Sequence, residues 1–493
     1  MLITFLSAGI LILLLIIVLI IRTMRYTRHH GQKNRFVPGD VDIDEAAIRL
    51  GKAISYETVS TQSTDDFDKV AFKKMHRFLE KAFPLIHQKL KKEIINEYSL
   101  LFTWQGSNTG LRPIMLTCHI DVVPIEPGTE KDWIHPPFEG AISDGYIWGR
   151  GAMDVQGGVL AIMEAVEHLL ETGFTPERTI YIGFGHDEEV DGLEGAFAIG
   201  ELLHSRGVTL EFLLDEGTPI VHDLLPEMPN PIALVAVAEK GYLSLELSAS
   251  SEGGHSSVPQ GLTSIAVLSE AIHKLENNPI RGKVDGLVKR TMEAIGPQMP
   301  FLYRVVMANI WLFRSLIKRE LDRMPATKAA MSTTIATTIF ESGIKENVLP
   351  TQARAIVNFR IHPNDTIESV KEHVRKAIND PNIQIKELNG SINPSHVSDV
   401  EEVPFKILRK TIKKVFPEVI VAPTLMIGAT DARHYAILTN NIYRFLPLRA
   451  DESDLDRVHG TNERLSKHNY HEMIYFYIQL IKNSSGSFEK LPE

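Results

Sequence analysis

The sequence contains almost no cysteine: Cys118 is the only one among 493 residues, so no intrachain disulfide can form. Cys118 lies in an apolar run directly before His119. Neighbouring side chains alternate between the two faces of a strand, so Cys118 and His119 should point in opposite directions. We therefore expect Cys118 to pack in a core rather than to act as a nucleophile.

An excess of positive charge is also missing, because 52 Lys and Arg stand against 62 Asp and Glu, a net charge of −10. Proteins that bind nucleic acid usually carry a basic stripe, often beside an aromatic platform, and the sequence has neither. Nucleic acid is therefore excluded as a partner. The length is sufficient for two domains with separate hydrophobic cores.

Charged residues are absent from Leu2 to Ile21, a run made mostly of Ile and Leu. A run of about 20 apolar residues spans the hydrocarbon core of a bilayer. A cleaved signal peptide would have a shorter apolar run, with basic residues before it and small residues after it. We therefore expect a single-pass membrane protein, with residues 1–38 as anchor and polar tether. The basic residues that follow the run are Arg22, Arg25, Arg28, Lys33 and Arg35.

What the sequence does contain is a series of His and carboxylate clusters, three of which directly follow an apolar run. The runs at 113–117, 179–184 and 210–214 have the composition of buried strands. Strand ends in an α/β sheet meet at one edge, where such sheets bind ligands. The clusters are His119-Ile-Asp121, Gly149-Arg-Gly-Ala-Met-Asp154, His186-Asp-Glu188-Glu189 and Asp215-Glu216-Gly217.

Imidazole and several carboxylates at one edge suit a divalent metal, with zinc as the first choice. Each residue taken alone has an ordinary explanation. His119 could be a hydrogen-bonded core histidine, Asp154 the N-cap of a helix over 155–172, and Glu188-Glu189 a solvated turn. Four such clusters in sequence order make the metal site the better interpretation.

Spacing within the clusters predicts different roles for neighbouring residues. His119 and Asp121 are two positions apart and should face the same way, so that Asp121 accepts a hydrogen bond from the far imidazole nitrogen. Glu188 and Glu189 are adjacent and should diverge. One can bind metal while the other faces the metal-bound water as a general base.

The order of these motifs, together with the later His459-Gly460, resembles the dinuclear zinc peptidases of the aminoacylase and glutamate-carboxypeptidase type. The likeness runs from about residue 54 to 480. Within that family the chain is most similar to the branch of the N-fatty-acyl-amino acid synthase/hydrolases and vacuolar carboxypeptidase S. Their secretory or vacuolar location opposes the cytoplasmic side that the basic residues after the anchor would indicate, so the orientation stays open.

The resemblance implies that two zinc ions share Asp154, whose peptide bond to Val155 is cis, and that Glu188 is the base. The family usually continues after the bridging Asp with Asp or Met and then Lys, whereas this chain has Val155-Gln156. Asp215 and Glu216 are adjacent and only one should bind; the sequence does not decide between them. The implied metal ligands are His119, Asp154, Glu189, one of Asp215 and Glu216, and His459.

After Gly241 the pattern becomes strand, helix, two strands, helix, strand, which is typical of a small two-layer α+β domain. The expected elements are 242–249, 262–275, 332–340, 353–361, 366–378 and 383–388. In the family this domain is an inserted lid that often forms a dimer. The expected fold is thus an α/β catalytic domain with a mixed sheet flanked by helices (39–239 and 396–493), interrupted by a lid (240–395).

Several residues outside the metal motifs match positions that the family uses around the substrate. The resemblance makes His255 the lid histidine that stabilises an oxyanion, often across a dimer interface. Asn347 and Arg360 match substrate positions, and the fork of an arginine suits a carboxylate. The turn from Gly428 through Thr430 to Arg433 is suited to bind a carboxylate through backbone N–H groups and Arg433.

These features predict a zinc-dependent amide hydrolase that cleaves, or also forms, N-acyl amino acids with a long apolar acyl group. The alternative is a carboxypeptidase or dipeptidase for small peptides with a free C-terminus. A non-catalytic relative should have lost Glu188 or a ligand, and none is missing. The segment Met299–Met324 is rich in large apolar side chains, with ten Phe, Leu, Ile, Val, Met and Trp residues between Phe301 and Leu316. It could form a buried hairpin in the lid or dimer contact, a wall for the acyl chain, or a membrane contact.

Overall fold

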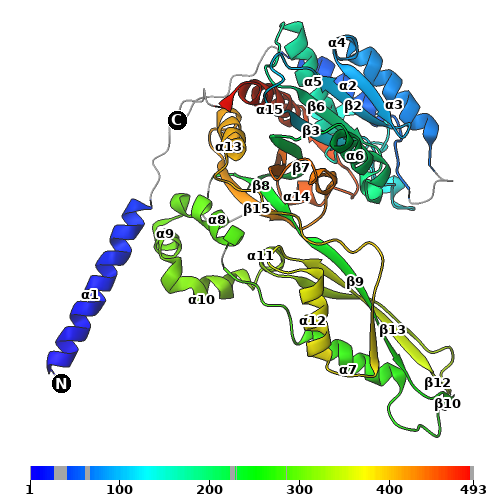
Figure 1. The fold of residues 1–493 in the computed structure, drawn as a ribbon, viewed down its shortest axis with the longest axis vertical. Coiled ribbons are helices and arrows are strands. Elements are labelled where there is room, and N and C mark those ends of the chain that lie inside the picture. The colour runs from blue at the N-terminus through cyan, green and yellow to red at the C-terminus, as the bar shows by residue number, and fades with distance from the viewer. Residues whose placement is uncertain are drawn as a thin grey trace.

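The computed structural model describes residues 2–26, 41–61, 67–222, 228, 230–284 and 286–488. Figure 1 shows three parts: a long helix at the N-terminus, a larger unit of sheet and helices, and an elongated smaller unit below it. The larger unit contains segments from both halves of the chain, and the smaller unit is inserted between them. The predicted α/β architecture is confirmed.

The larger unit is built on an eight-stranded sheet in the order β1-β2-β6-β3-β7-β16-β8-β15. Strands β6, β3, β7 and β16 are parallel neighbours, and β1, β2 and β8 join antiparallel, so the sheet is mixed as predicted. The strand bounds are β1 Lys91–Ile95, β2 Ser99–Trp104, β3 Ile114–His119, β6 Ile180–Gly185, β7 Phe212–Val221, β8 Ile232–Glu239, β15 Ile420–Met426 and β16 Ile442–Ala450.

Helices cover both faces of this sheet because its central strands are apolar on both sides. On β3, Leu116 and Cys118 pack into the main core with α5, whereas Met115 packs on the opposite face with α6. Cys118 is fully buried, as the predicted packing role requires. The helices of this unit are α2 Ile43–Ile54, α3 Lys69–Ala82, α4 Pro84–Lys89, α5 Gln156–Glu171, α6 Ala198–Ser205, α13 Val403–Val415, α14 Glu452–Leu455 and α15 Lys467–Ser484.

The smaller unit has an antiparallel sheet in the order β11-β13-β9-β14, with α7 and α12 packed against it. Each of its main elements lies within a few residues of its predicted position. Their bounds are β9 Gly241–Ser250, α7 Ser264–Glu276, β11 Thr334–Ser342, β13 Gln352–Ile361, α12 Ile367–Ile378 and β14 Ile383–Glu387. At the far end of this unit, the short strands β10 Gly254–His255 and β12 Val348–Leu349 pair to form its tip (Figure 1).

Four helices lie between α7 and β11 in the chain, and only the middle two were predicted, as one interpretation of the apolar segment 299–324. They are α8 Gly286–Ile295, α9 Phe301–Ala308, α10 Ile310–Leu321 and α11 Pro325–Met331. They do not contribute to the core of the smaller unit in the part of the chain that the structure describes. Met299 instead packs with Ile232 and Ile420 at the starts of β8 and β15, and Thr291 donates a hydrogen bond to the Pro423 carbonyl. The segment interpreted as a hairpin inside the lid therefore lies outside the lid core, and α8 before it packs on β15, the edge strand of the large sheet.

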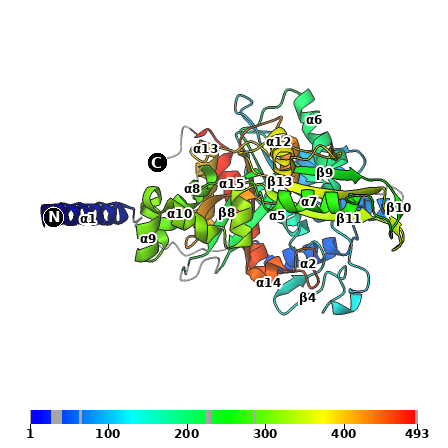
Figure 2. The ribbon, with the colours of Figure 1, turned by 90° about the horizontal axis from the view of Figure 1, so that it is seen from below.

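The N-terminal helix α1, Leu2–Arg25, confirms the predicted apolar helix. It is long and apolar enough to cross a membrane, and a signal sequence would meet the same criterion. Figure 2 shows α1 projecting away from the rest of the molecule. Most of the predicted tether, with Arg28, Lys33 and Arg35, falls among residues 27–40, which lie outside the described residues.

Candidate metal centre

The sheet places three of the predicted clusters side by side. His119 is the last residue of β3, and Glu188 and Glu189 open a short 3-10 turn after β6. Glu216 lies in β7. Because β3 is hydrogen-bonded to β6 on one side and β7 on the other, these side chains meet at one sheet edge. This convergence is what the sequence predicted.

A small second sheet brings the remaining clusters to the same place. Strand β17, Arg464–Ser466, pairs with β5, Tyr146–Trp148, which also pairs with β4, Ile142–Ser143. The loops that flank β5 and β17 therefore run together, and they carry Asp154 and His459. Two motifs about 300 residues apart in the chain become neighbours through this pairing.

The carboxylate of Glu463 fastens these two loops to each other. It is fully buried and accepts a hydrogen bond of 2.8 Å from the Arg150 guanidinium. It also accepts the backbone N–H groups of Gly151 (3.1 Å), Met153 (2.8 Å) and Asp154 (3.1 Å). The sequence gives no direct indication of this role beyond a carboxylate four positions after His459.

The peptide bond between Asp154 and Val155 is cis, as the resemblance implied. Gln156 stands where the family usually has Lys, and its side-chain amide donates to the Thr58 hydroxyl at 3.0 Å and the Ile120 carbonyl at 3.4 Å. In this chain the Gln156 side chain therefore fixes the backbone at Ile120, the residue directly after His119.

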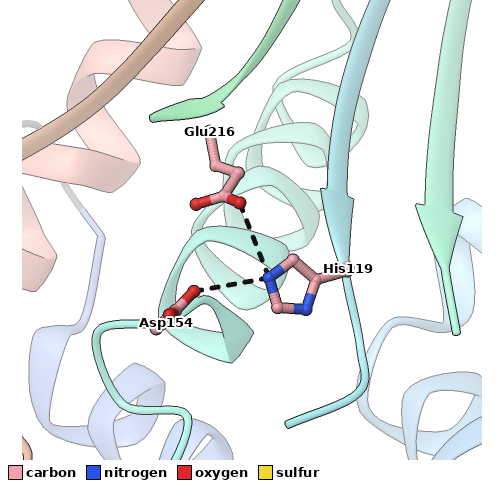
Figure 3. Close-up of side chains that lie close together, drawn as sticks. All are labelled: His119, Asp154 and Glu216. Carbon is pink, nitrogen blue, oxygen red and sulfur yellow. Dashed lines mark ion pairs between the residues drawn. The ribbon is translucent and has the colours of Figure 1, made fainter. Parts of the chain in front are cut away.

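Two groups of potential metal ligands form at this edge and share Asp154. The first is His119, Asp154 and Glu216, and the second is Asp154, Glu189 and His459; within each, the ligand atoms lie within 4.8 Å of one another. In the first group, His119 Nε2 lies 3.4 Å from Asp154 Oδ1 and 3.6 Å from Glu216 Oε1 (Figure 3). In the second, His459 Nε2 lies 3.0 Å from Asp154 Oδ2 and 3.3 Å from Glu189 Oε2.

The donor set fits a pair of divalent cations. His119 Nε2 and Glu189 Oε1 are buried and have no hydrogen-bond partner among the described residues, an arrangement that is costly unless a cation binds there. Although burial opposes it, the carboxylates of Asp121, Asp154 and Glu216 raise the pKa of His119. Hydrogen bonds to Asp154 and Glu189 raise the pKa of His459 to about 10. The site therefore strongly favours positive charge.

The structure separates Asp215 from Glu216, which the sequence left as alternatives. Glu216 belongs to the first group, whereas Asp215 belongs to neither. The Asp215 carboxylate is buried and accepts the Glu216 backbone N–H at 2.9 Å. Burial, with the nearby Glu216 charge, raises the pKa of Asp215 to about 8.

Asp121 holds the site differently from the prediction. The His119 Nδ1 atom forms a hydrogen bond of 2.9 Å with the backbone carbonyl of Asp121. The carboxylate oxygen Oδ1 of Asp121 lies farther from the same nitrogen, at 3.4 Å. The predicted side-chain hydrogen bond is thus replaced by a backbone one, because β3 ends at His119 and the chain no longer alternates. The Asp121 carboxylate instead accepts the backbone N–H groups of Glu188 (3.3 Å) and Glu189 (3.2 Å).

Glu188 and Glu189 diverge as predicted. Glu189 contributes to the second group, and Glu188 contributes to neither. Burial raises the pKa of Glu188 well above its ordinary value, and the charges of Asp431 and Glu216 add to this effect while His119 opposes it. Asp121 therefore fixes a turn that presents the Glu189 carboxylate to the second group and holds the Glu188 carboxylate, whose pKa is raised, beside it.

Comparison with known proteins agrees with this geometry. Residues 115–483, more than half of the chain, match the model of peptidase family M20/M25/M40. The chain belongs to this family. Enzymes of the family are metal-dependent hydrolases that typically hold two ions, so the predicted enzyme class is confirmed.

Two relatives and one solved structure illustrate the similarity. "Probable carboxypeptidase S-like 2" of Dictyostelium discoideum is 42% identical, over 95% of this chain and 92% of its own. "N-fatty-acyl-amino acid synthase/hydrolase PM20D1" of Mus musculus is 41% identical, over 90% of this chain and 88% of its own. The M20 metallo-carboxypeptidase Sso-CP2 of Sulfolobus solfataricus shares the fold, with a TM-score of 0.65 and 19% identity over 89% of this chain and 99% of that one.

Unlike the candidate metal ligands, the predicted lid residues His255 and Asn347 of this M20 chain do not reach the site within one chain. His255 is exposed at the tip, where its Nδ1 bonds to the Ser257 hydroxyl at 2.8 Å, and Asn347 accepts the Ser256 N–H beside it. The tip lies far from β3 in Figure 1. Arg360 lies near the other end of β13, over the Tyr242 ring at 5.0 Å. The ten residues of β13 make these two ends about 30 Å apart.

The predicted carboxylate-binding turn lies beside the Glu188 turn. Arg433 Nη2 donates to the Asp191 carbonyl at 2.9 Å, directly after the Glu188–Val190 turn. Thr430 is already engaged, because its N–H and hydroxyl donate to buried Glu239 at 3.2 and 2.6 Å. Gly428 is exposed, so its backbone is open to solvent.

Proposed function

We propose that this M20 chain is a dizinc amide hydrolase that cleaves, and can also form, N-acyl amino acids with a long apolar acyl group. The observation that carries the proposal is the pair of ligand groups joined at Asp154, with the Glu188 carboxylate beside them. The similarity to a protein named for N-fatty-acyl-amino acids, over nine tenths of the chain, supports this substrate class.

In this proposal, His119, Asp154 and Glu216 hold one zinc ion, and Asp154, Glu189 and His459 hold the other. A mixture of imidazole nitrogen and carboxylate oxygen is the ligand chemistry that suits zinc. When bound, the ions supply an acidified water and a polarised substrate carbonyl.

The chain's own residues handle the protons. Glu188 accepts the proton of the attacking water and later delivers it to the nitrogen of the leaving amine. Its raised pKa makes it a stronger base than an ordinary carboxylate. Asp121 contributes by holding the Glu188–Glu189 backbone and, through its own carbonyl, the orientation of His119.

The free carboxylate is assigned to Arg360, to Asn347 or to the turn from Gly428 through Thr430 to Arg433, and the oxyanion is assigned to His255. Because His255 and Asn347 lie at the tip of their own chain, we propose a homodimer in which each tip serves the metal centre of the partner. Mixing inactive Glu188→Gln with inactive His255→Ala tests this. Random pairing should restore roughly a quarter of the activity. No recovery from a confirmed mixed dimer would exclude this arrangement.

A carboxypeptidase is the second candidate, and the relative named carboxypeptidase S-like 2 favours it. A hydrolysis panel with added zinc separates the two. The panel compares acetyl, medium-chain and long-chain acyl-amino acids with dipeptides, and uses Glu188→Gln as the blank. We expect the rate to rise with acyl length; activity confined to dipeptides would transfer the assignment to the carboxypeptidase.

We further propose that α1 anchors the chain in a membrane as a single span. Its apolar residues are exposed over most of its length, which suits contact with lipid. Flotation of the full chain with lipid vesicles after an alkaline carbonate wash tests this anchoring. Release by carbonate would refute it.

A further inference from the structure

The outward surface of α9 and α10 is unusually apolar. Six large side chains are 42% to 77% exposed there: Phe301, Leu302, Tyr303, Trp311, Leu312 and Leu316. We refer to these six residues as the α9–α10 face. A contiguous exposed apolar surface usually marks a contact with another molecule or with lipid.

The α9–α10 face is not a misplaced part of the core, because these helices already bury their other side. Met307 of α9 packs against a cluster that contains residues of β8 and β15, and Ile310 and Ile317 of α10 pack with Met292 and Met331 in a separate cluster. Each helix thus has an inner apolar side that packs against other residues of the chain and an outer apolar side that is exposed.

The position of α9 against α1 indicates what lies over the α9–α10 face. The Arg22 guanidinium donates to the Ala308 carbonyl at 3.4 Å, and the Tyr26 hydroxyl to the Met292 carbonyl at 3.2 Å. Asn309 Nδ2 lies 3.5 Å from the Leu19 carbonyl. Both Figure 1 and Figure 2 show α9 beside the C-terminal end of α1.

The contacts between α1 and α9 define how deep α9 would lie relative to a bilayer that α1 spans. The uncharged part of α1 ends at Ile21, and Arg22 is the first charge after it. The contacts of α9 therefore fall where a bilayer spanned by α1 would give way to its headgroups. The contact at Leu19 lies about 4.5 Å along the helix from Arg22, on the side of the apolar run. The end of α9 therefore reaches slightly from the headgroup level toward the hydrocarbon core. Interfacial helices bury their apolar side about 5–10 Å into this region.

We propose that the α9–α10 face lies in the headgroup layer of the bilayer that α1 spans, as a second membrane contact. The inference rests on the proposed anchoring by α1 and goes beyond it, since it fixes the orientation of the enzyme on the lipid surface. Trp311 and Tyr303 are the residue types that prefer this layer. An amphiphilic acyl-amino acid would then be taken from the surface on which the enzyme sits.

The charges beside the α9–α10 face favour lipid over a second copy of the chain. Arg314 and Arg319 are exposed on α10 and form no ion pair with any of the residues that the structure describes. Anionic headgroups would be attracted to them. In a symmetric contact between two copies, the six residues of the partner's α9–α10 face would offer these arginines no carboxylate.

Quenching of tryptophan fluorescence by brominated lipids tests the proposal on the full chain. Trp104, Trp133 and Trp148 are at most 8% exposed, so a comparison with Trp311→Phe isolates the signal of Trp311. The chain is reconstituted into phosphatidylcholine–phosphatidylserine vesicles with or without brominated acyl chains. We expect the emission of Trp311 to be lost in brominated vesicles and the Trp311→Phe emission to change little.

A pair of charge substitutions supplies the matched control. Leu302→Glu should recover part of the Trp311 emission, because it lifts the α9–α10 face from the lipid. Ile344→Glu changes a side chain that is 94% exposed on the far tip and should leave quenching unchanged. Equal quenching in both variants would overturn the proposal.

The same preparations distinguish the remaining outcomes. A chain that floats with vesicles while Trp311 stays unquenched keeps its anchor but overturns the inference. Self-association that Leu302→Glu removes and Ile344→Glu leaves intact would then assign the α9–α10 face to a second copy. A chain that does not float overturns both the anchor and the inference. Activity on the acyl-amino acid panel is measured in parallel, so a failure of the proposed function is seen separately.

Discussion

Replacing Glu463 with Ala tests how the loop that carries Asp154 is held. The change removes the acceptor of the buried Arg150 and of three backbone N–H groups. Stranding one member of a buried ion pair costs about 3–5 kcal/mol. Arg150 would still donate to the carbonyls of His459 and Gly460, both at 3.1 Å. We therefore expect a loss of about 3 kcal/mol in the free energy of unfolding, at the lower end of that range.

Urea unfolding in detergent, with and without chelator, measures this loss. Glu93→Ala is the matched control, because Glu93 makes a two-pronged pair with Arg206 at 2.7 and 2.9 Å near the surface. Such pairs contribute about 0–1 kcal/mol. Glu463→Ala should also weaken metal binding by about 10–100-fold, as expected when a supporting partner is lost. A Glu463→Ala protein with wild-type stability and metal affinity would refute the reasoning.

Two further predictions concern catalysis. Glu188→Gln should lower kcat by about two to four powers of ten while the bound metal, measured by mass spectrometry, stays constant; loss of metal from Glu188→Gln but not from Glu189→Gln would mean that the two roles are reversed. Specificity should rise with acyl length, because each buried methylene contributes about 0.8 kcal/mol, and kcat/KM across an acyl series measures this; a flat series would count against a long acyl substrate.

Much of this molecule follows from local patterns in the sequence. The buried strands β3 and β6 were recognisable as short, continuous apolar runs, and β9 was recognisable by its alternation of apolar and polar residues. The order of the His and carboxylate motifs identified the metal centre, because strand ends in such a sheet meet at one edge regardless of the conformation of the connecting loops. The opposite orientations of the Cys118 and His119 side chains also follow from alternation, because both residues lie within β3.

Other features depend on long-range pairing or on where a strand stops. Glu463 has a role only because β17 pairs with β5. Asp121 could not be placed by spacing, since β3 ends before it. Asp215 and Glu216 both lie inside β7, and only the packing around them shows which one faces His119. The apolar segment 299–324 was ambiguous because its amphipathic pattern does not say that α9 meets α1.

The acyl-wall hypothesis for that segment now competes with its observed surroundings. Figure 1 places α9 beside α1 and α10 next to α9, both away from β3, whose last residue is His119. The exposed side chains there are explained more simply by lipid contact. The preference for a long acyl group remains a prediction and does not need this segment as its wall.

The metal content of three variants tests the central claim most directly. After removal of metal and reloading with zinc, the wild-type chain should hold about two ions, and Asp154→Ala should lose most of both, because both groups share that carboxylate. Glu216→Gln should retain about one ion, whereas Asp215→Asn should retain about two, because only Glu216 belongs to a ligand group. Two ions in Glu216→Gln, together with the loss of one from Asp215→Asn, would contradict the account.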